Sequence, residues 1–144
     1  MRYFAVIDTN VLVSALMKPN SVPGSVLTET LNGTIIPLLN SKILAEYEDV
    51  LSRRKFKFDS RDVRVTIDEI VRRGLFVDAE PLDAYLPDPK DVVFYEVTME
   101  KRKTDDAYLV TGNTKHFPTE QFVVTPREMM AIIYGDIVSP TSDR

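Results

Sequence analysis

Acidic side chains occur at positions where an α/β protein would gather them in one cleft. Asp8 directly follows residues 3–7, an aromatic and β-branched run that is typical of a buried strand. Ligands of open α/β sheets bind at the carboxyl ends of strands, so Asp8 is expected to lie in a ligand-binding or catalytic site. The alternative is structural, because Asp8 or Thr9 could simply cap the helix predicted over residues 9–17.

Two further aspartates open a predicted helix. Asp88 precedes Pro89, which suits an N-cap followed by proline at the first helical position. Asp91 is then the third helical residue and heads a row with Phe94 and Tyr95, so its carboxylate points along the inward face and needs a partner. In the alternative interpretation Asp88 is only a cap and Asp91 completes a capping-box-like pair.

A third acid comes from the helix predicted over residues 42–53, with Ser41 as its N-cap. Glu46 and Glu48 lie on opposite flanks of the apolar stripe of this helix. Periodicity does not choose between them, and either one can be an ordinary solvated charge.

The elements that must position these acids alternate between strand and helix. The predicted strands are residues 3–7, 34–39, 75–77, 107–110 and 122–124. The predicted helices are residues 9–17, 25–31, 42–53, 59–73, the segment from Asp88 to about 103, and 126 to about 134. Pro37 weakens the second strand or places it toward an edge. This alternation predicts a three-layer α/β/α fold with a five-stranded parallel sheet.

The order of the strands decides which residues meet. If the order is 3-2-1-4-5, the winding reverses between the first and fourth strands, and a crevice opens between their carboxyl ends. Asp8-Thr9-Asn10 follows the first of these strands and Thr111-Gly112-Asn113 follows the other. Asp8 and Asn113 would then face each other, Asp91 would enter from the helix before the fourth strand, and Glu46 could enter from the helix after the second.

Three carboxylates and a carboxamide in one cleft would suit a hard divalent cation such as Mg²⁺ or Mn²⁺. Without a metal, such a cluster would repel itself strongly. The chemistry that fits this cluster is hydrolysis of a phosphodiester, in which the cation neutralises phosphate charge and lowers the pKa of a water molecule.

Composition limits the class of protein. The chain has 144 residues, 44% hydrophobic and 28% charged, which suits one globular domain, expected over residues 1–135 with a loose tail at 136–144. There is no cysteine, so any metal must be held by oxygen ligands or by His116. The net charge of -4 excludes a surface that is basic throughout. Without a signal-peptide core or a long apolar run, we expect a cytoplasmic protein with no membrane segment.

Four sequence motifs resemble those of PIN domains, in the same order and over about residues 3–134. The motifs are Asp8-Thr9-Asn10-Val11-Leu12-Val13-Ser14-Ala15-Leu16, Glu46-Tyr47-Glu48-Asp49-Val50-Leu51, Asp88-Pro89-Lys90-Asp91-Val92-Val93-Phe94 and Tyr108-Leu109-Val110-Thr111-Gly112-Asn113-Thr114-Lys115-His116-Phe117-Pro118. The chain is most similar to small single-domain PIN proteins regarded as VapC-like toxins of bacterial toxin–antitoxin pairs.

The resemblance implies a metal-dependent ribonuclease with the 3-2-1-4-5 sheet. By this resemblance Asp8, Glu46 and Asp91 match the acidic metal-binding positions, and Thr111 matches a hydroxyl at the site. Many PIN domains carry aspartate where this chain has Asn113. The change removes a negative charge, so a one-metal mechanism, slow turnover or inactivity stays open.

Other residues complete the expected site. The side chains expected to line it are Thr9, Asn10, Asp88, Thr111 and Asn113. Asp88 or Asp106 could replace the carboxylate missing at position 113. The candidates for contacts with RNA phosphates are Arg53, Arg54, Lys55, Lys115 and His116, for which a solvated charge is the alternative. His116 as a general base is the less favoured interpretation.

Competing functions are judged by the same residues. A haloacid dehalogenase-type phosphatase needs a second aspartate two residues after the first, where this chain has Asn10, and a receiver domain needs paired early acids. The serious alternative is a noncatalytic PIN-fold module that binds RNA or a protein partner, motivated by Asn113. As a toxin, the protein would form a homodimer and be blocked by a small antitoxin.

Overall fold

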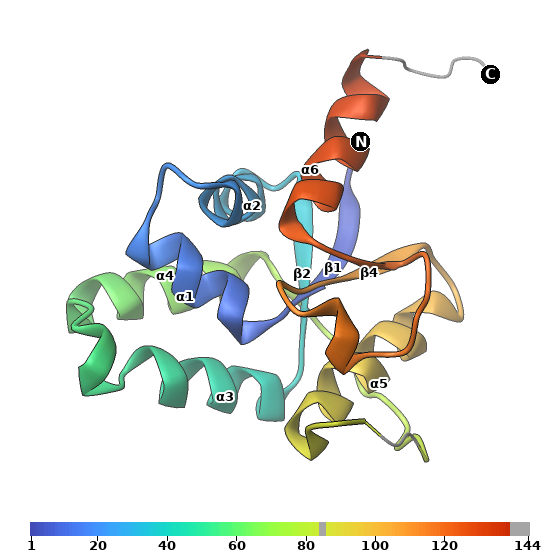
Figure 1. Ribbon diagram of the computed structural model, residues 1–144, viewed down its shortest axis with the longest axis horizontal. Coiled ribbons are helices and arrows are strands. Elements are labelled where there is room, and N and C mark those ends of the chain that lie inside the picture. The colour runs from blue at the N-terminus through green and yellow to red at the C-terminus, as the bar shows by residue number, and fades with distance from the viewer. Residues whose placement is uncertain (84–85, 139–144) are drawn as a thin grey trace.

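The computed structural model describes residues 1–83 and 86–138 and contains a five-stranded parallel sheet in the order β3-β2-β1-β4-β5 (Figure 1). The predicted fold and strand order are therefore confirmed. The strands are β1 (Tyr3–Ile7), β2 (Ile35–Leu39), β3 (Leu75–Phe76), β4 (Ala107–Val110) and β5 (Val123–Val124). The helices are α1 (Thr9–Met17), α2 (Val22–Leu31), α3 (Ser41–Leu51), α4 (Ser60–Arg73), α5 (Val92–Arg102) and α6 (Pro126–Val138). Short 3₁₀ turns are η1 (Arg54–Phe56), η2 (Pro89–Asp91) and η3 (Thr114–His116).

The register of the central strands puts two polar residues level with each other. In the parallel ladder of β1 and β4, Ile7 pairs with Val110. The next residues along the two strands are Asp8 and Thr111, and the Asp8 backbone N–H donates to the Val110 carbonyl oxygen at 2.9 Å. Since both strands run the same way, these side chains emerge at the same carboxyl edge.

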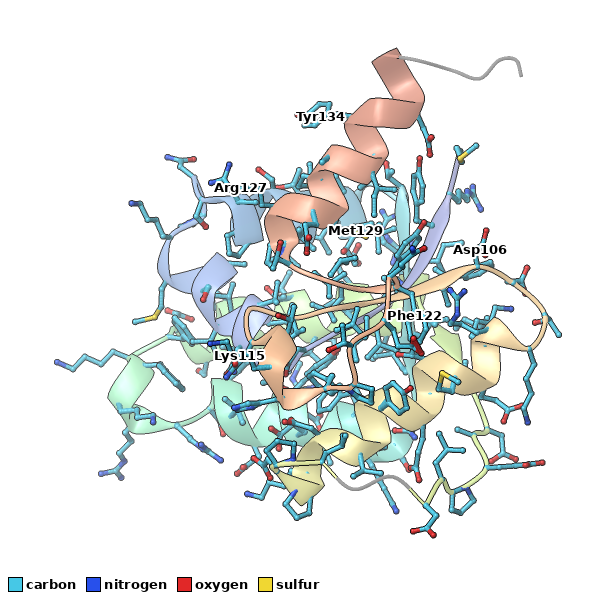
Figure 2. All side chains as sticks on the ribbon, turned by 45° about the vertical axis from the view of Figure 1, so that its right-hand side comes forward. Asp106, Lys115, Phe122, Arg127, Met129 and Tyr134 are labelled. Atoms are coloured by element: carbon cyan, nitrogen blue, oxygen red, sulfur yellow. The ribbon has the colours of Figure 1, made fainter. Side chains whose placement is uncertain are left out.

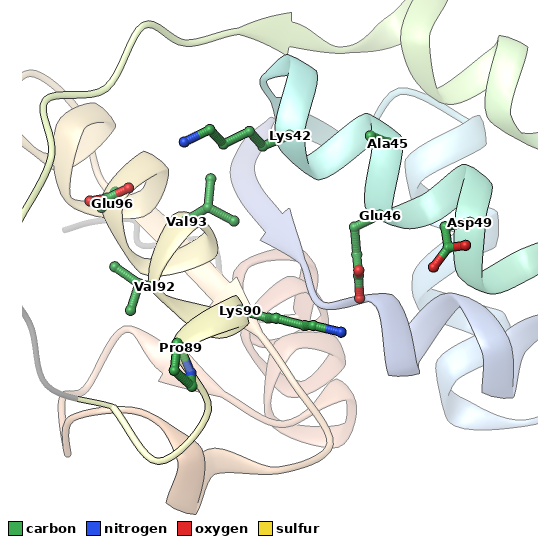
Figure 3. A pocket seen from close by; sticks show the side chains of 9 residues that line it. All are labelled: Lys42, Ala45, Glu46, Asp49, Pro89, Lys90, Val92, Val93 and Glu96. Atoms are coloured by element: carbon green, nitrogen blue, oxygen red, sulfur yellow. The ribbon is translucent and has the colours of Figure 1, made fainter.

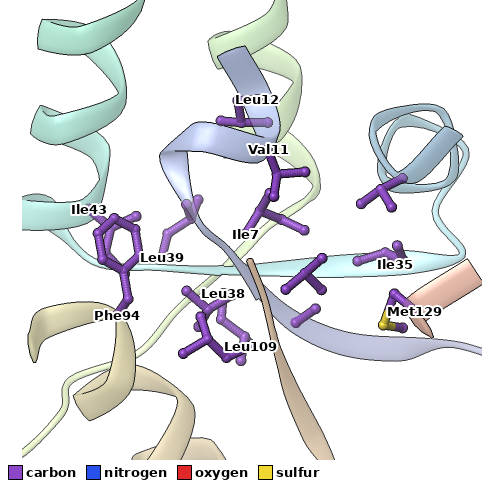
Figure 4. Packing of buried hydrophobic residues seen from close by; sticks show 14 of the residues in the cluster. Ile7, Val11, Leu12, Ile35, Leu38, Leu39, Ile43, Phe94, Leu109 and Met129 are labelled. Carbon is purple, nitrogen blue, oxygen red and sulfur yellow. The ribbon is translucent and has the colours of Figure 1, made fainter. Parts of the chain in front are cut away.

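Helices cover the sheet on both faces. Helix α5 packs against β1, β2 and β4, whereas α1, α2 and α4 pack with one another on the other side, where α6 joins α2 (Figure 1). Phe94 of α5 is 1% exposed and belongs to the same buried cluster as Ile43 and Met129, which come from α3 and α6 (Figure 4). The predicted inward row of α5 is confirmed, because Phe94, Tyr95 and Thr98 are buried.

Several predicted helix starts were wrong, each because of local capping. Helix α2 begins at Val22 rather than at 25, since the Ser21 side chain accepts from the Gly24 N–H and Pro23 sits in the first turn. The N-cap of α3 is Asn40, whose Oδ1 accepts from the Ile43 N–H at 2.9 Å, and not Ser41.

The second strand also differs from its prediction. Pro37 does not mark an edge strand, because β2 lies between β1 and β3. Its pairing with β3 begins only at Leu38, one residue after the proline. The predicted third strand, 75–77, is assigned over two residues only, and both are exposed.

The end of the described chain is helical. Helix α6 runs to Val138, beyond its predicted end at about 134, so the tail expected from 136 begins inside it; residues 139–144 lie outside the described residues (Figure 2). Tyr3 of β1 donates its hydroxyl to the Asp136 carboxylate, which fastens α6 to the first strand. Within residues 1–83 and 86–138, no helix is long and apolar enough to cross a lipid bilayer.

Replacing either of two glycines by alanine should change stability in opposite directions. A Cβ atom at Gly24 would lie 2.0 Å from the Pro19 carbonyl oxygen, whereas one at Gly135 would meet nothing within 4 Å. We expect Gly24→Ala to lower the free energy of unfolding by about 2 kcal/mol or more, because backbone must move. Gly135→Ala, at an exposed position of α6, should raise it by about 0.5–1 kcal/mol. Thermal and urea unfolding would check both, and equal effects of the two would contradict the steric argument.

Candidate active site

Asp8 lies at the carboxyl end of β1 with only 6% of its surface exposed. Asp8 occupies the N-cap position of α1 without a side-chain capping hydrogen bond, and its functional interpretation stays a prediction. One carboxylate oxygen instead accepts a hydrogen bond from the Thr111 hydroxyl at 2.7 Å. Burial raises the pKa of Asp8, and Thr111 and the backbone amides of Asn10 and Thr9 oppose that rise.

The segment after β4 forms the other side of the site. Thr111 is fully buried, and besides donating to Asp8 its hydroxyl oxygen accepts from the Asn113 backbone N–H at 3.0 Å. The Asn113 amide nitrogen lies 3.0 Å from His116 Nε2. The predicted trio after the fourth strand therefore faces the trio after the first, and Thr111 connects the two.

Asp91 enters the site from the junction of η2 and α5. Its side chain is 14% exposed and makes no capping hydrogen bond, so the capping-box interpretation fails for this residue. Burial, followed by the negative charges of Asp8 and Asp88, raises its pKa from 3.8 to about 6. His116 Nδ1 lies 3.4 Å from the Asp91 carboxylate and opposes this rise. Asp88 itself is exposed and caps η2 through the Lys90 N–H at 3.0 Å, as the structural interpretation predicted.

Helix α3 presents Glu46, and not Glu48, toward the acids. The fully buried Tyr47 hydroxyl donates to the Ile7 carbonyl oxygen at 2.5 Å, which holds α3 against the end of β1. Glu46 points from α3 toward the junction of β1 and α1 (Figure 3). Glu48 points elsewhere, because it lies 3.7 Å from Arg64 of α4.

Asp8, Asp91 and Glu46 lie at the same end of the sheet but do not form a ready metal-binding cluster. Among the described residues, no group of three or more acidic or histidine side chains is close enough to hold a metal ion as it stands. Asp8 and Asp91 do act on each other electrostatically, and Glu46 lies on the α3 side of the cleft. The set Asp8, Glu46 and Asp91 as metal ligands thus stays a prediction.

The donor set nevertheless fits a hard cation. Asp8 and Asp91 supply oxygen atoms, and their mutual repulsion is what a bound cation relieves. Thr9, the neighbour of Asp8 in the chain, is 3% exposed, and its buried hydroxyl has no hydrogen-bond partner within residues 1–83 and 86–138. Mg²⁺ is typically held by one or two carboxylates together with water molecules, so a pair of acids with a third nearby suffices.

The remaining predicted residues are spread more widely. Asn10 is exposed in the first turn of α1. Arg53 lies two residues beyond the end of α3 and pairs with Asp49 at 2.9 Å. Arg54 and Lys55 form η1 beyond it, and Lys115 is exposed on η3 beside His116. Their contact with RNA stays a prediction.

The suggestion that Asp106 replaces the acid missing at position 113 was wrong. Asp106 precedes β4 and so lies at the amino end of that strand, whereas the site lies at its carboxyl end (Figure 2). Sequence reasoning also missed a role for Tyr47, although a tyrosine within an apolar helical stripe signals a hydroxyl that needs a buried acceptor.

The Thr111 hydroxyl yields a prediction for the site. Thr111→Val keeps the shape but removes the hydroxyl that donates to the buried Asp8 carboxylate and accepts from the Asn113 N–H. We expect the free energy of unfolding to fall by about 1–3 kcal/mol, and the pKa of Asp8 to rise further. Thr111→Ser, which keeps the hydroxyl, should restore most of the loss. Thermal unfolding of the three proteins at pH 7 measures this, and a valine variant as stable as wild type would contradict it.

Comparison with known proteins adds one finding to this geometry. No curated protein matches the sequence. The family model for the PIN domain matches residues 5–115, which is more than half of the chain and includes Asp8, Glu46, Asp91 and Asn113. Together with the 3-2-1-4-5 parallel sheet, this match establishes that the chain belongs to the PIN domain family.

Proposed function

We propose that this protein is an endoribonuclease that hydrolyses RNA phosphodiester bonds with the help of Mg²⁺ or Mn²⁺. PIN domains are generally nucleases, and they generally use divalent metal ions. The single observation that carries the proposal for this chain is the buried Asp8, which is joined to Thr111 across the switch point and raises the pKa of Asp91.

Asp8 and Asp91, with Glu46 beside them, are the residues that would hold the cation. When bound there, a divalent cation supplies Lewis acidity to a phosphate and to a water molecule. Thr111 orients the Asp8 carboxylate, and His116 faces Asp91. The hydrogen bond of Tyr47 to Ile7 sets the rotation of α3 that directs Glu46 toward the end of β1. Each of these contacts fixes the position of an acid before substrate arrives.

The experiment compares cleavage of structured and single-stranded RNAs in Mg²⁺, in Mn²⁺ and in EDTA. The Asp8→Asn protein, purified in parallel, is the control for contaminating nucleases. We expect cleavage by the wild-type protein with either metal, and none in EDTA or by the variant. Cleavage that persists in EDTA or in Asp8→Asn would defeat the proposal.

A second function is favoured by one observation, which is Asn113 at a position where many PIN domains carry aspartate. The missing carboxylate favours a PIN-fold module that binds RNA or a protein partner with little or no catalysis. Binding of RNA or of Mn²⁺ without any cleavage would support this module over the nuclease.

We further propose that the protein acts as the toxin of a toxin–antitoxin pair, as a homodimer that a small antitoxin blocks. The support is the resemblance of the four sequence motifs to those of small single-domain PIN proteins, within a chain that belongs to the PIN domain family. A neighbouring reading frame of antitoxin size would be the first evidence. Expression of the protein should arrest growth, co-expression of that neighbour should relieve the arrest, and light scattering should give the mass of two chains. Normal growth with Asp8 intact would contradict the toxin role.

A further inference from the structure

The side chain of Lys90 comes toward the acids from the wall of the cleft opposite Glu46. A pocket of about 610 Å³ lies between α3 and the start of α5, and both Glu46 and Lys90 line it. In Figure 3 the Lys90 ammonium and the Glu46 carboxylate are directed toward each other, beside the junction of β1 and α1. Lys90 therefore belongs to the same cleft as the three proposed ligands of the cation.

The backbone of Lys90 is fixed relative to one of those ligands. Asp88 accepts a hydrogen bond from the Lys90 backbone N–H at 3.0 Å, and Pro89 between them has a restricted φ. Asp91 follows Lys90 directly in the chain, and its side chain is 14% exposed. The turn η2 thus presents a buried carboxylate and an ammonium group side by side at the mouth of the cleft.

The two lysines that line this pocket differ in direction and not in accessibility. Lys42 and Lys90 are both exposed, and neither makes an ion pair within residues 1–83 and 86–138. Lys90 extends toward Glu46, whereas Lys42 extends toward the side of the pocket where Glu96 lies (Figure 3). Lys42 is therefore a matched control for any role that depends on where the Lys90 charge is placed.

The charges of the cleft indicate how many cations it can take. The three proposed ligands carry three negative charges when ionised, Asn113 is neutral, and His116 is counted as neutral at pH 7. With the positive charge of Lys90 included, one divalent cation gives a neutral cleft, whereas two leave an excess of two positive charges. Asp88 also acts on the site, but it is exposed and contributes less than burial and Asp8 do to the raised pKa of Asp91.

We propose that the cleft takes a single divalent cation and that Lys90 is a catalytic residue, whose ammonium supplies the second positive charge and contacts the scissile phosphate. This inference rests on the proposed ribonuclease function. In sites with two metal ions the second ion offsets charge on the phosphate oxygens, and a lysine ammonium can do the same as a point charge.

Lys90 stabilises charge in this reaction and transfers no proton. The oxygen of water forms the new bond to phosphorus, and the bond from phosphorus to one ester oxygen breaks. That ester oxygen keeps the bonding electron pair and takes up the proton that the water loses. Throughout, a nonbridging phosphate oxygen accepts a hydrogen bond from the Lys90 ammonium, which is charge-assisted and short-ranged.

The first measurement is Mn²⁺ binding without RNA, by isothermal titration in about 0.15 M KCl, where a surface charge acts over only about 8 Å. We expect one ion per chain. Lys90→Met should bind Mn²⁺ about fivefold more tightly, because a positive charge is removed from beside the cation. Lys90→Arg keeps the charge and should bind like wild type. Lys42→Met, with the same change of charge in the same pocket, should stay within about twofold of wild type.

The second measurement is single-turnover cleavage, at saturating protein and Mn²⁺, of the RNA that the wild-type protein cleaves fastest. Lys90→Met should be slower by about 100-fold, the usual cost of losing one group that stabilises the transition state. Lys90→Arg should recover most of that loss, and Lys42→Met should cleave like wild type. Tighter Mn²⁺ binding with slower cleavage separates this role from a simple ion pair with Glu46, whose removal would raise both.

Each result bears on a separate part of the proposal, once thermal unfolding has shown that all the variants fold. Two ions per chain, or an unchanged affinity for Mn²⁺ in Lys90→Met, overturns the charge assigned to Lys90. Unchanged cleavage by Lys90→Met overturns the contact with the phosphate. A wild-type protein that binds one ion, responds to Lys90→Met in the titration and never cleaves removes the ribonuclease function and leaves the one-cation cleft. No Mn²⁺ binding by wild type overturns both.

Discussion

Replacing Asp91 by asparagine is expected to stop cleavage and, in the absence of metal, to stabilise the fold. Under the proposed ribonuclease function, cleavage should fall by about 10³-fold, because loss of a proposed ligand of the cation would remove several kcal/mol of transition-state stabilisation. The folded protein holds the Asp91 proton more tightly than the unfolded chain does, since burial and the nearby charges of Asp8 and Asp88 raise its pKa to about 6. At pH 7 the ionised carboxylate therefore costs about 2–3 kcal/mol, and asparagine removes that cost.

The size of this effect on stability depends on pH. The stability contributed by the Asp91 proton is fully present below the ordinary pKa of 3.8 and is lost as the pH rises through about 6. Asp91→Asn should therefore melt several degrees above wild type at pH 7.5 in EDTA and at nearly the same temperature at pH 3.5. Asp49→Asn, which changes an exposed acid, is the control. A variant that is less stable than wild type at pH 7.5 in EDTA would contradict the strain assigned to this site.

Acid should weaken binding of the proposed cation. As a ligand, Asp91 would bind the cation in its ionised form, so protons would compete with the cation below about pH 6. We expect the affinity for Mn²⁺ to fall by about tenfold between pH 7 and pH 5 and to change little between pH 7 and pH 8.

Isothermal titration with Mn²⁺ at these three values of pH measures that loss directly, without any cleavage. The same titration with Asp91→Asn should show weak binding throughout, with a much smaller dependence on pH. Affinity for Mn²⁺ that is equal at pH 5 and pH 7 in the wild-type protein would show that the ligands titrate well below the range derived for Asp91.

The sheet and the position of Asp8 could be predicted from the sequence because both depend on local patterns. A short β-branched run followed by a polar trio occurs twice, at Asp8 and at Thr111, and the parallel register then makes the two meet. Asp91 was predicted to face inward from its place in a helical row, and its low exposure agrees with that. The N-cap of α3 was wrong because Asn40 and Ser41 are both good caps and only the backbone geometry decides between them.

The choice between Glu46 and Glu48 could not be made from periodicity. It depends on a long-range contact, the Tyr47 hydroxyl on the Ile7 carbonyl, which sets the rotation of α3. The pocket between α3 and the start of α5 was missed for a similar reason, since Lys42 and Lys90, which line it, are far apart in sequence. Features made by pairs of distant elements need the packing to be known.

The two edge strands determine how readily the sheet can pair with another chain at high protein concentration. Both β3 and β5 span only two residues, so each border of the sheet offers few free backbone donors and acceptors to another chain. Leu75 and Phe76 of β3 are nevertheless exposed, at 39% and 52%. The described sheet therefore offers no long edge strand on which a fibril could be templated, although hydrophobic side chains are exposed on β3.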